Sequence, residues 1–134
     1  MAKSDKRKLI EKMDKVCRDI VLIRDKNTCQ MCGKYAERHN AHASHVVPKS
    51  VSGYLRHNLN NLKLLCYRCH FYVWHIDPIK SEQWFKKKFP YRYRYVQKNR
   101  RHLDDIDLEK HHEKLKRKLT KLLREQKGGC LLSE

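Results

Sequence analysis

The 134-residue chain is 40% hydrophobic and 35% charged, so its apolar core must be small, and we expect one domain with appended helices. The net charge of +17 requires an anionic partner. Nucleic acid is the first candidate, and an anionic membrane surface is a weaker one because the basic residues are not confined to one amphipathic helix. The opening residues lack the apolar stretch of a secretion signal and no apolar run is long enough to cross a membrane, so we exclude membrane proteins and expect a cytoplasmic location.

The first predicted element is a helix within residues 1–28. Its apolar residues recur at the spacing of one helical face, namely Leu9, Met13, Val16, Ile20 and Ile23. Cys17 lies beside that stripe and is expected to be a small core residue rather than a metal ligand. The following "CQMCGK" indicates a tight turn in which Gly33 takes a positive φ.

Two short strands and a helix are predicted in the middle of the chain. "NAHASHVV" alternates and ends in β-branched residues before Pro48, which indicates a strand, and "LKLLC" indicates a second strand after a loop over residues 49–61. A helix then begins at Tyr67 and ends near Asp77, because a proline follows it. The run 71–74 (Phe, Tyr, Val, Trp) is expected to supply the core around this helix rather than to stack on bases.

Residues 80–134 are predicted to form a basic helical extension. Ser81 is a candidate cap for a short helix over "SEQWFKKKF". Residues 83–103 hold eight Lys or Arg and no acid, so this tyrosine-rich tract is either a surface that stacks on unpaired bases or a solvated basic face with its tyrosines in the core. A last helix starts within "DDIDLEK" and stops before Gly128. Its leucine stripe can pack on the domain, pair with a second copy in a homodimer, or order only on DNA.

Two C-x-x-C pairs supply four thiolates, Cys29 with Cys32 and Cys66 with Cys69. Four thiolates suit a closed tetrahedral site, so we predict a structural Zn²⁺ rather than a redox pair or a secreted disulfide framework. A zinc ion with four sulfur ligands needs no histidine, which leaves the neighbouring His70 and His75 for other roles.

The segments "SHVVP" and "NLKLLC" lie between the cysteine pairs, and a histidine directly follows the second pair. This order of strand histidine, loop asparagine and helix histidine resembles the HNH endonuclease family, whose core is a small ββα-metal (His-Me finger) fold. The layout is most similar to phage recombination nucleases of the NinG type, which share a helix ending in "IRD", then C-x-x-C-G, "SH", and "CH" with a trailing "H-x-x-P". The resemblance covers roughly residues 16–95. It implies an α+β fold with a zinc-stabilised core over residues 29–79, flanked by an N-terminal helix and C-terminal helices.

The resemblance implies hydrolysis of phosphodiester bonds that leaves a 5′-phosphate and a 3′-hydroxyl. His45 takes the role of general base, because a neutral imidazole can accept a proton from water. His70 takes the role of a ligand of a catalytic Mg²⁺, Mn²⁺ or another divalent ion. Asn61 holds the loop geometry and orients His45.

Ser44 departs from the commonest HNH pattern, since many members have an Asp or His ligand directly before the base. A hydroxyl is a poor ligand for a hard cation, so we expect fewer protein ligands and more water around the ion. Ser44 itself, His42 and His75 are further candidate ligands, but His42 requires an irregular strand and His75, five residues after His70, requires a distorted helix. The remaining histidines are expected to be exposed or loop residues without metal roles, namely His39, His57, His102, His111 and His112.

Basic residues on both sides of the predicted centre are candidates for contacts with DNA phosphates. They are Lys49, Arg56, Lys63 and Arg68 close to it, and Lys87, Arg92, Arg94 and Arg100 in the tyrosine-rich tract. We therefore predict a metal-dependent DNA endonuclease, encoded by a phage and acting in the host cytoplasm in recombination, packaging or DNA nicking. The alternative is a zinc-ribbon nucleic-acid-binding protein without catalysis.

Overall fold

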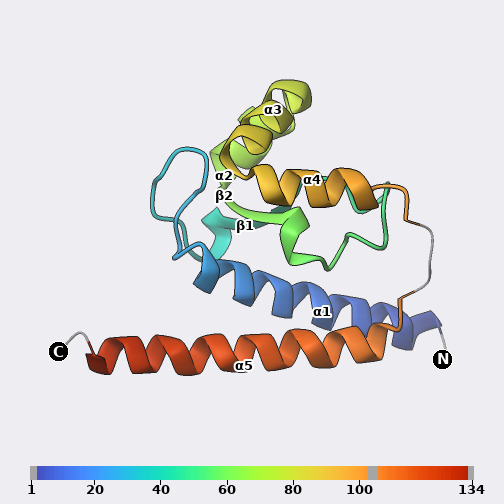
Figure 1. The fold of residues 1–134 in the computed structure, drawn as a ribbon, viewed down its shortest axis with the longest axis vertical. Coiled ribbons are helices and arrows are strands. Elements are labelled where there is room, and N and C mark those ends of the chain that lie inside the picture. The colour runs from blue at the N-terminus through green and yellow to red at the C-terminus, as the bar shows by residue number, and fades with distance from the viewer. Residues whose placement is uncertain (1–2, 103–105, 133–134) are drawn as a thin grey trace.

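The computed structural model of the chain describes residues 3–102 and 106–132. Its elements are, in order, α1 (Lys3–Arg24), η1 (Arg38–Asn40), β1 (Ala41–His45), η2 (Leu59–Asn61), β2 (Leu62–Cys66), α2 (Tyr67–Cys69), the π-helix η3 (His70–Trp74), α3 (Pro78–Lys88), α4 (Pro90–Asn99) and α5 (Leu108–Leu132). A two-stranded hairpin lies between α1 and α5 on one side and α3 and α4 on the other (Figure 1). This combination of a small sheet and separate helices agrees with the predicted α+β class. None of the described helices is long and apolar enough to cross a membrane.

The hairpin pairs β1 with β2 in antiparallel register, with Ser44 opposite Lys63 and His45 opposite Leu62. Alternate residues of a strand face opposite sides, so His42 and Ser44 share one face while His45 lies on the other. The face of Ser44 packs towards η3, where Lys63 Nζ lies 3.4 Å from the centre of the Trp74 ring. His42 and His45 therefore lie on opposite faces of the hairpin, although both line one cleft.

The C-terminal end of α1 is tied to the hairpin by two charged residues. Arg24 donates hydrogen bonds to the carbonyl oxygens of Leu59 and Leu62, at 2.8 and 2.6 Å. Asp25 is buried and accepts from the Leu64 backbone N–H at 2.9 Å. The predicted helix is confirmed, and the "IRD" at its end holds the second strand and the turn before it.

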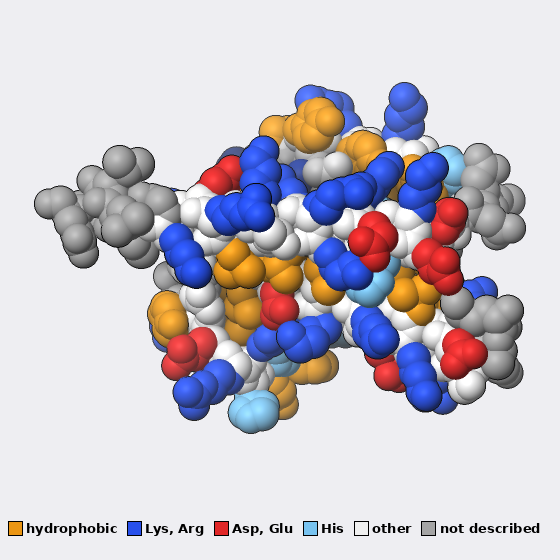
Figure 2. Space-filling view, turned by 90° about the horizontal axis from the view of Figure 1, so that it is seen from below, with side chains coloured by type: hydrophobic (Ala, Val, Ile, Leu, Met, Phe, Trp, Pro, Cys, Tyr) orange, Lys and Arg blue, Asp and Glu red, His pale blue; other side chains and the backbone are white. Residues whose placement is uncertain are grey.

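Helix α5 lies beside α1 and runs in the same direction (Figure 1). Leu115 is 4% exposed, and Leu119 and Leu122 pack against the same core. The leucine stripe therefore packs on the domain, the first of its three predicted alternatives. Figure 2, seen from the α5 side, shows Lys and Arg side chains spread along this face with apolar side chains between them.

Helix α3 begins earlier than predicted. Asp77, not Ser81, caps it, because its side chain accepts from the Lys80 backbone N–H and Pro78 fits the first turn. Ser81 lies inside the helix, where its hydroxyl donates to the Val73 carbonyl at 3.3 Å. The tyrosine-rich tract forms a further helix, α4. Its tyrosines are divided between the two predicted alternatives, because Tyr91 is exposed while Tyr93 and Tyr95 pack against the core.

Two further predictions are wrong. Only Trp74 of the run 71–74 is buried, and Phe71, Tyr72 and Val73 are 42%, 62% and 42% exposed, because the π-helix gives one narrow inward face. The last helix does not stop before Gly128 but continues to Leu132. A glycine costs a helix only about 1 kcal/mol relative to alanine, which a long preceding helix can tolerate.

Candidate active site

The first cysteine pair lies on a small hairpin closed by a bridge between Thr28 and Tyr35. The Cys32 backbone N–H donates to Cys29 Sγ at 3.5 Å, which holds the two cysteines of this turn close together. Gly33 completes the turn with φ +78°, as predicted, a conformation that favours glycine.

The second cysteine pair joins β2 to α2. Cys66 ends the strand and caps the helix, because its Sγ accepts from the Cys69 backbone N–H at 3.5 Å. The two knuckles are held together by a hydrogen bond from the Gln30 backbone N–H to the Leu64 carbonyl at 2.9 Å. The strand that carries one pair therefore also positions the other.

The four sulfur atoms of Cys29, Cys32, Cys66 and Cys69 all lie within 4.8 Å of one another, and Cys32 and Cys66 Sγ are 3.8 Å apart. A tetrahedral zinc ion with Zn–S bonds of about 2.3 Å separates its sulfurs by about 3.8 Å. Burial raises the pKa of the Cys69 thiol and the neighbouring sulfurs raise it further, so four thiolates at this spacing need a cation. The cluster could thus hold zinc. Cys17 takes no part and is a buried core residue, as expected.

His45, the predicted base, ends β1 with its ring partly buried. Its Nε2 lies 2.9 Å from the Arg56 carbonyl oxygen, and since a carbonyl only accepts, Nε2 carries the hydrogen. The lone pair of the neutral ring is then on Nδ1, the atom that can accept a proton. Burial lowers the pKa of His45 to about 4, so the ring is neutral at physiological pH. It lines a cleft of about 260 Å³ that also contains Lys49 and Arg56.

Asn61 is fully buried and uses both ends of its amide. Its Oδ1 accepts from the Val47 N–H at 2.8 Å, and its Nδ2 donates to the carbonyls of Val47 and Leu55 at 3.0 and 3.1 Å. Its own carbonyl accepts from the Val46 N–H at 2.9 Å. Asn61 therefore contacts the residues that directly follow His45 and the loop that returns to Arg56, and reaches His45 only through the backbone.

His42 and His70 form a close pair between β1 and the helix. Their Nδ1 atoms are 2.9 Å apart, and His42 Nε2 donates to the His39 carbonyl at 2.8 Å. A backbone carbonyl that takes Nε2–H is the usual way a protein leaves Nδ1 free for a metal. Two nitrogens about 2.1 Å from an octahedral ion and at right angles to each other lie about 3.0 Å apart. With the hydrogen of His42 on Nε2, the 2.9 Å contact is a hydrogen bond that His70 Nδ1 donates to His42 Nδ1, and an ion bound by both Nδ1 atoms would require the His70 hydrogen to sit on Nε2 instead. Burial lowers the pKa of His70 to about 4, so its ring is neutral.

His75 lies beside His70 because the helix is distorted there. The His75 N–H donates to the His70 carbonyl at 3.1 Å, a π-helical bond between residues five apart. The two ring centres are 4.6 Å apart. The π-turn therefore places residues five apart on the same side of the helix, so the spacing of His70 and His75 does not keep their rings apart. His42 reaches His70 from a regular strand, and the irregular strand that we expected His42 to need is not required.

Ser44 and Lys63 occupy a different environment from the one expected. Ser44 is 1% exposed, and its hydroxyl accepts from Lys63 Nζ at 2.9 Å. Lys63 is 0% exposed beneath Trp74, and burial lowers its pKa well below the ordinary value. The prediction that Lys63 contacts DNA phosphates is wrong, because a lysine in the core reaches no ligand. The hydroxyl of Ser44 is buried and already accepts a hydrogen bond from this amine, so it is a poor candidate ligand for a cation.

The other basic candidates differ in accessibility. Lys49, Arg68, Lys87 and Arg94 are exposed. Arg92 is half-buried over the Phe89 ring at 4.4 Å and Arg100 pairs with Glu82 at 3.8 Å, so both are less available than expected.

An acidic residue of α1, Asp14, was not anticipated from the sequence. Its carboxylate accepts from Arg56 Nη2 at 2.7 Å and from His57 Nε2 at 2.6 Å. Burial raises the pKa of Asp14, but the hydrogen bonds from His57 and Arg56 outweigh burial and hold it well below its usual range. His57 lies in the loop between the strands, as the prediction allowed, but it is buried, with 4% of its surface exposed. An acid at the polar edge of α1's apolar stripe was the one sequence signal of this contact.

Residues 29–71 match the family model described as HNH endonuclease. The matched segment contains both cysteine pairs, His42, His45, Asn61 and His70. The match suggests nuclease activity with nucleic acid as substrate, and it gives no support for the NinG type in particular. Comparisons with curated proteins and with solved structures returned no match.

Proposed function

We propose that the chain is a metal-dependent endonuclease that hydrolyses phosphodiester bonds in DNA. The observation that carries the proposal is the orientation of His45: a backbone carbonyl fixes its Nε2–H, so that Nδ1 is the acceptor in a cleft that also holds Lys49 and Arg56. A general base, phosphate-binding cations and a nearby pair of histidine nitrogens are the groups that phosphodiester hydrolysis needs.

The residues divide the chemistry between them. His45 Nδ1 takes the proton of the attacking water, and Lys49 with Arg56 holds the phosphate by charge. Asn61 keeps the loop that carries Arg56, and so keeps the carbonyl that orients His45. His42 and His70 would hold the divalent ion, with His75 beside them. A bound Mg²⁺ or Mn²⁺ stabilises the charge that develops on a non-bridging and on the leaving oxygen.

The test is nicking of supercoiled plasmid in Mg²⁺ or Mn²⁺ by the wild type and by His45→Ala. We expect the variant to keep its zinc and its DNA affinity and to lose about 10²- to 10⁴-fold in cleavage rate. His39→Ala is the matched control, because this exposed histidine contributes only its backbone to the site. His42→Ala and His70→Ala should raise the Mn²⁺ concentration needed for half-maximal cleavage, and Ser44→Ala should not.

If the wild type binds DNA but does not cut it with any divalent ion tested, the remaining function is that of a zinc-ribbon nucleic-acid-binding protein without catalysis. Among the described residues, no carboxylate joins His42 and His70 in a cluster of candidate metal ligands, which favours that second candidate. The biological process is a finer question. Cleavage of a synthetic four-way junction in preference to plasmid would support the proposed phage recombination role, and nicking of linear duplex would support packaging.

A further inference from the structure

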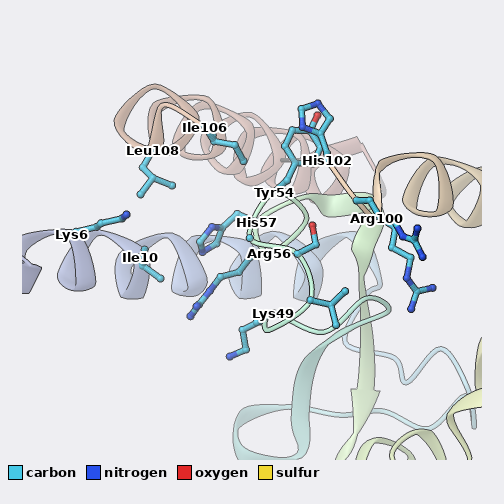
Figure 3. A pocket seen from close by; sticks show the side chains of 14 residues that line it. Lys6, Ile10, Lys49, Tyr54, Arg56, His57, Arg100, His102, Ile106 and Leu108 are labelled. Atoms are coloured by element: carbon cyan, nitrogen blue, oxygen red, sulfur yellow. The ribbon is translucent and has the colours of Figure 1, made fainter. Parts of the chain in front are cut away.

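A second hollow, larger than the His45 cleft, is lined by residues of α1, of the loop 49–57, and of the stretches 100–102 and 106–108 (Figure 3). Its volume is about 780 Å³. Its walls carry Lys6, Lys49, Arg56, Arg100 and Arg101, and none of its described lining residues is acidic. We call this hollow the basic groove.

Exposed cations and a stacked pair of rings are among the described residues that line the basic groove. Lys6 of α1 and Arg101, which follows α4, are both exposed and both line the groove. Inside, the Tyr54 and His102 rings are stacked 3.9 Å apart and nearly parallel. The apolar side chain of Ile10 also lines the groove from α1. Exposed cations carried by separate segments of the chain suit an extended anion rather than a small one.

The basic groove joins the His45 cleft. Lys49 and Arg56 line both hollows. Arg56 is the junction: its side chain is held by Asp14, and its carbonyl orients His45. A polyanion lying in the basic groove is therefore led towards the base.

We propose that the basic groove binds the sugar–phosphate backbone of the DNA to one side of the bond that is cut. This inference rests on the proposed function only for the path of the DNA strand towards His45. Binding of DNA in the groove does not depend on that function. A membrane surface is a poorer fit, because it would need a protruding or flat face rather than a groove. An acidic peptide is a poorer fit, because it gives no reason for the groove to continue into the His45 cleft. The groove uses residues outside the segment that matches the HNH model, such as Lys6 and Arg101.

The experiment measures binding of a fluorescein-labelled duplex of about 30 base pairs, without added divalent ion, over a range of NaCl concentrations. The groove variant is Lys6→Gln with Arg101→Gln. The control variant, Lys114→Gln with Lys118→Gln, removes the same charge from exposed positions of α5. Both variants are first compared with the wild type in thermal unfolding and zinc content.

We expect the groove variant to weaken binding about tenfold or more and to lower the slope of log K against log salt by about 1 to 2, as the loss of two phosphate contacts predicts. The control should change affinity less than about threefold. Equal weakening by both variants, or an unchanged slope in the groove variant, would overturn the proposal in favour of unspecific attraction by the net charge.

The two proposals fail in different ways. If the wild type cuts DNA while the groove variant binds and cuts equally well, the basic groove fails and the endonuclease stands. If the wild type cuts nothing while only the groove variant loses binding and salt dependence, the endonuclease fails and the basic groove stands.

Discussion

Single side chains decide how the base is held. Asn61 makes three side-chain hydrogen bonds to backbone groups on two stretches of the loop between the strands. An asparagine fits because it offers one acceptor and two donors, which match one N–H and two carbonyls.

Asn61→Ala should lower the free energy of unfolding by about 2 to 4 kcal/mol, because buried backbone groups lose their partners. Asn61→Asp should cost at least as much, since a carboxylate would face the carbonyls of Val47 and Leu55. Urea unfolding measures both. Asn60→Asp is the neighbouring control, and a loss there as large as at Asn61 would contradict the assignment.

Asp14 acts on His45 indirectly, through Arg56. It fixes Arg56 and His57 from α1, while the carbonyl of Arg56 holds the ring of His45. We regard Asp14 as a positioning residue, because it does not enter the chemistry proposed above.

Asp14→Asn should lower the free energy of unfolding by about 1 to 2 kcal/mol at pH 6, since ion pairs that are partly exposed contribute modestly. The folded-state pKa of Asp14 lies below the unfolded value of about 3.9, so its contribution is present above that pH and is lost as the pH falls through and below it. The gap between wild type and variant should narrow from pH 6 to pH 3 in denaturant titrations. A gap that widens towards pH 3 would reverse the sign of the linkage.

At the scale of elements, two distortions bring the site together. The knuckle at Cys66 starts α2 directly after β2, and the π-turn of η3 then brings His75 beside His70. The helix start is fixed by the cysteine pair, so loss of the metal should affect the histidines as well.

Cys32→Ser should abolish tight zinc binding and most of the cooperative unfolding, because metal binding to such a cluster contributes on the order of 10 kcal/mol. Elemental analysis should find one zinc per chain in the wild type and in Cys17→Ala, whose cysteine lies in the core. Full zinc content in Cys32→Ser would remove Cys32 from the ligand set.

At the scale of the whole molecule, α1 is covered on both sides. The hairpin packs on one face and α5 packs along another, so that the ends of the sequence stabilise its centre (Figure 1). The basic groove exists only because the chain returns to the N-terminal end of α1 before α5 begins.

Leu115→Ala should destabilise the chain by about 2 to 4 kcal/mol, the cost of a cavity under a buried leucine. Thermal unfolding at several protein concentrations distinguishes packing within the chain from pairing with a second copy. We expect a midpoint independent of concentration. A midpoint that rises with concentration would indicate that the predicted homodimer forms through this stripe.

Local patterns predicted the parts of the fold that depend on spacing along the chain. The apolar period of α1, the alternation in β1, the turn at Gly33 and the paired cysteines each depend on neighbours a few residues apart. The sequence does not fix the start of α3, because Asp77 and Ser81 are both residue types that cap helices. Ser81 does not cap the helix, because its hydroxyl donates to the Val73 carbonyl instead.

The sequence by itself determined the chemistry that is available: four thiolates in two pairs, a histidine at the end of a strand, another at the start of a helix, and a large positive charge. Only the tertiary structure decided which groups meet. It buried Lys63 under Trp74, joined His42 to His70, and placed Asp14 against Arg56 across 42 residues of sequence. Contacts of that kind depend on how helices and strands pack, and packing is set by the whole core rather than by any local pattern.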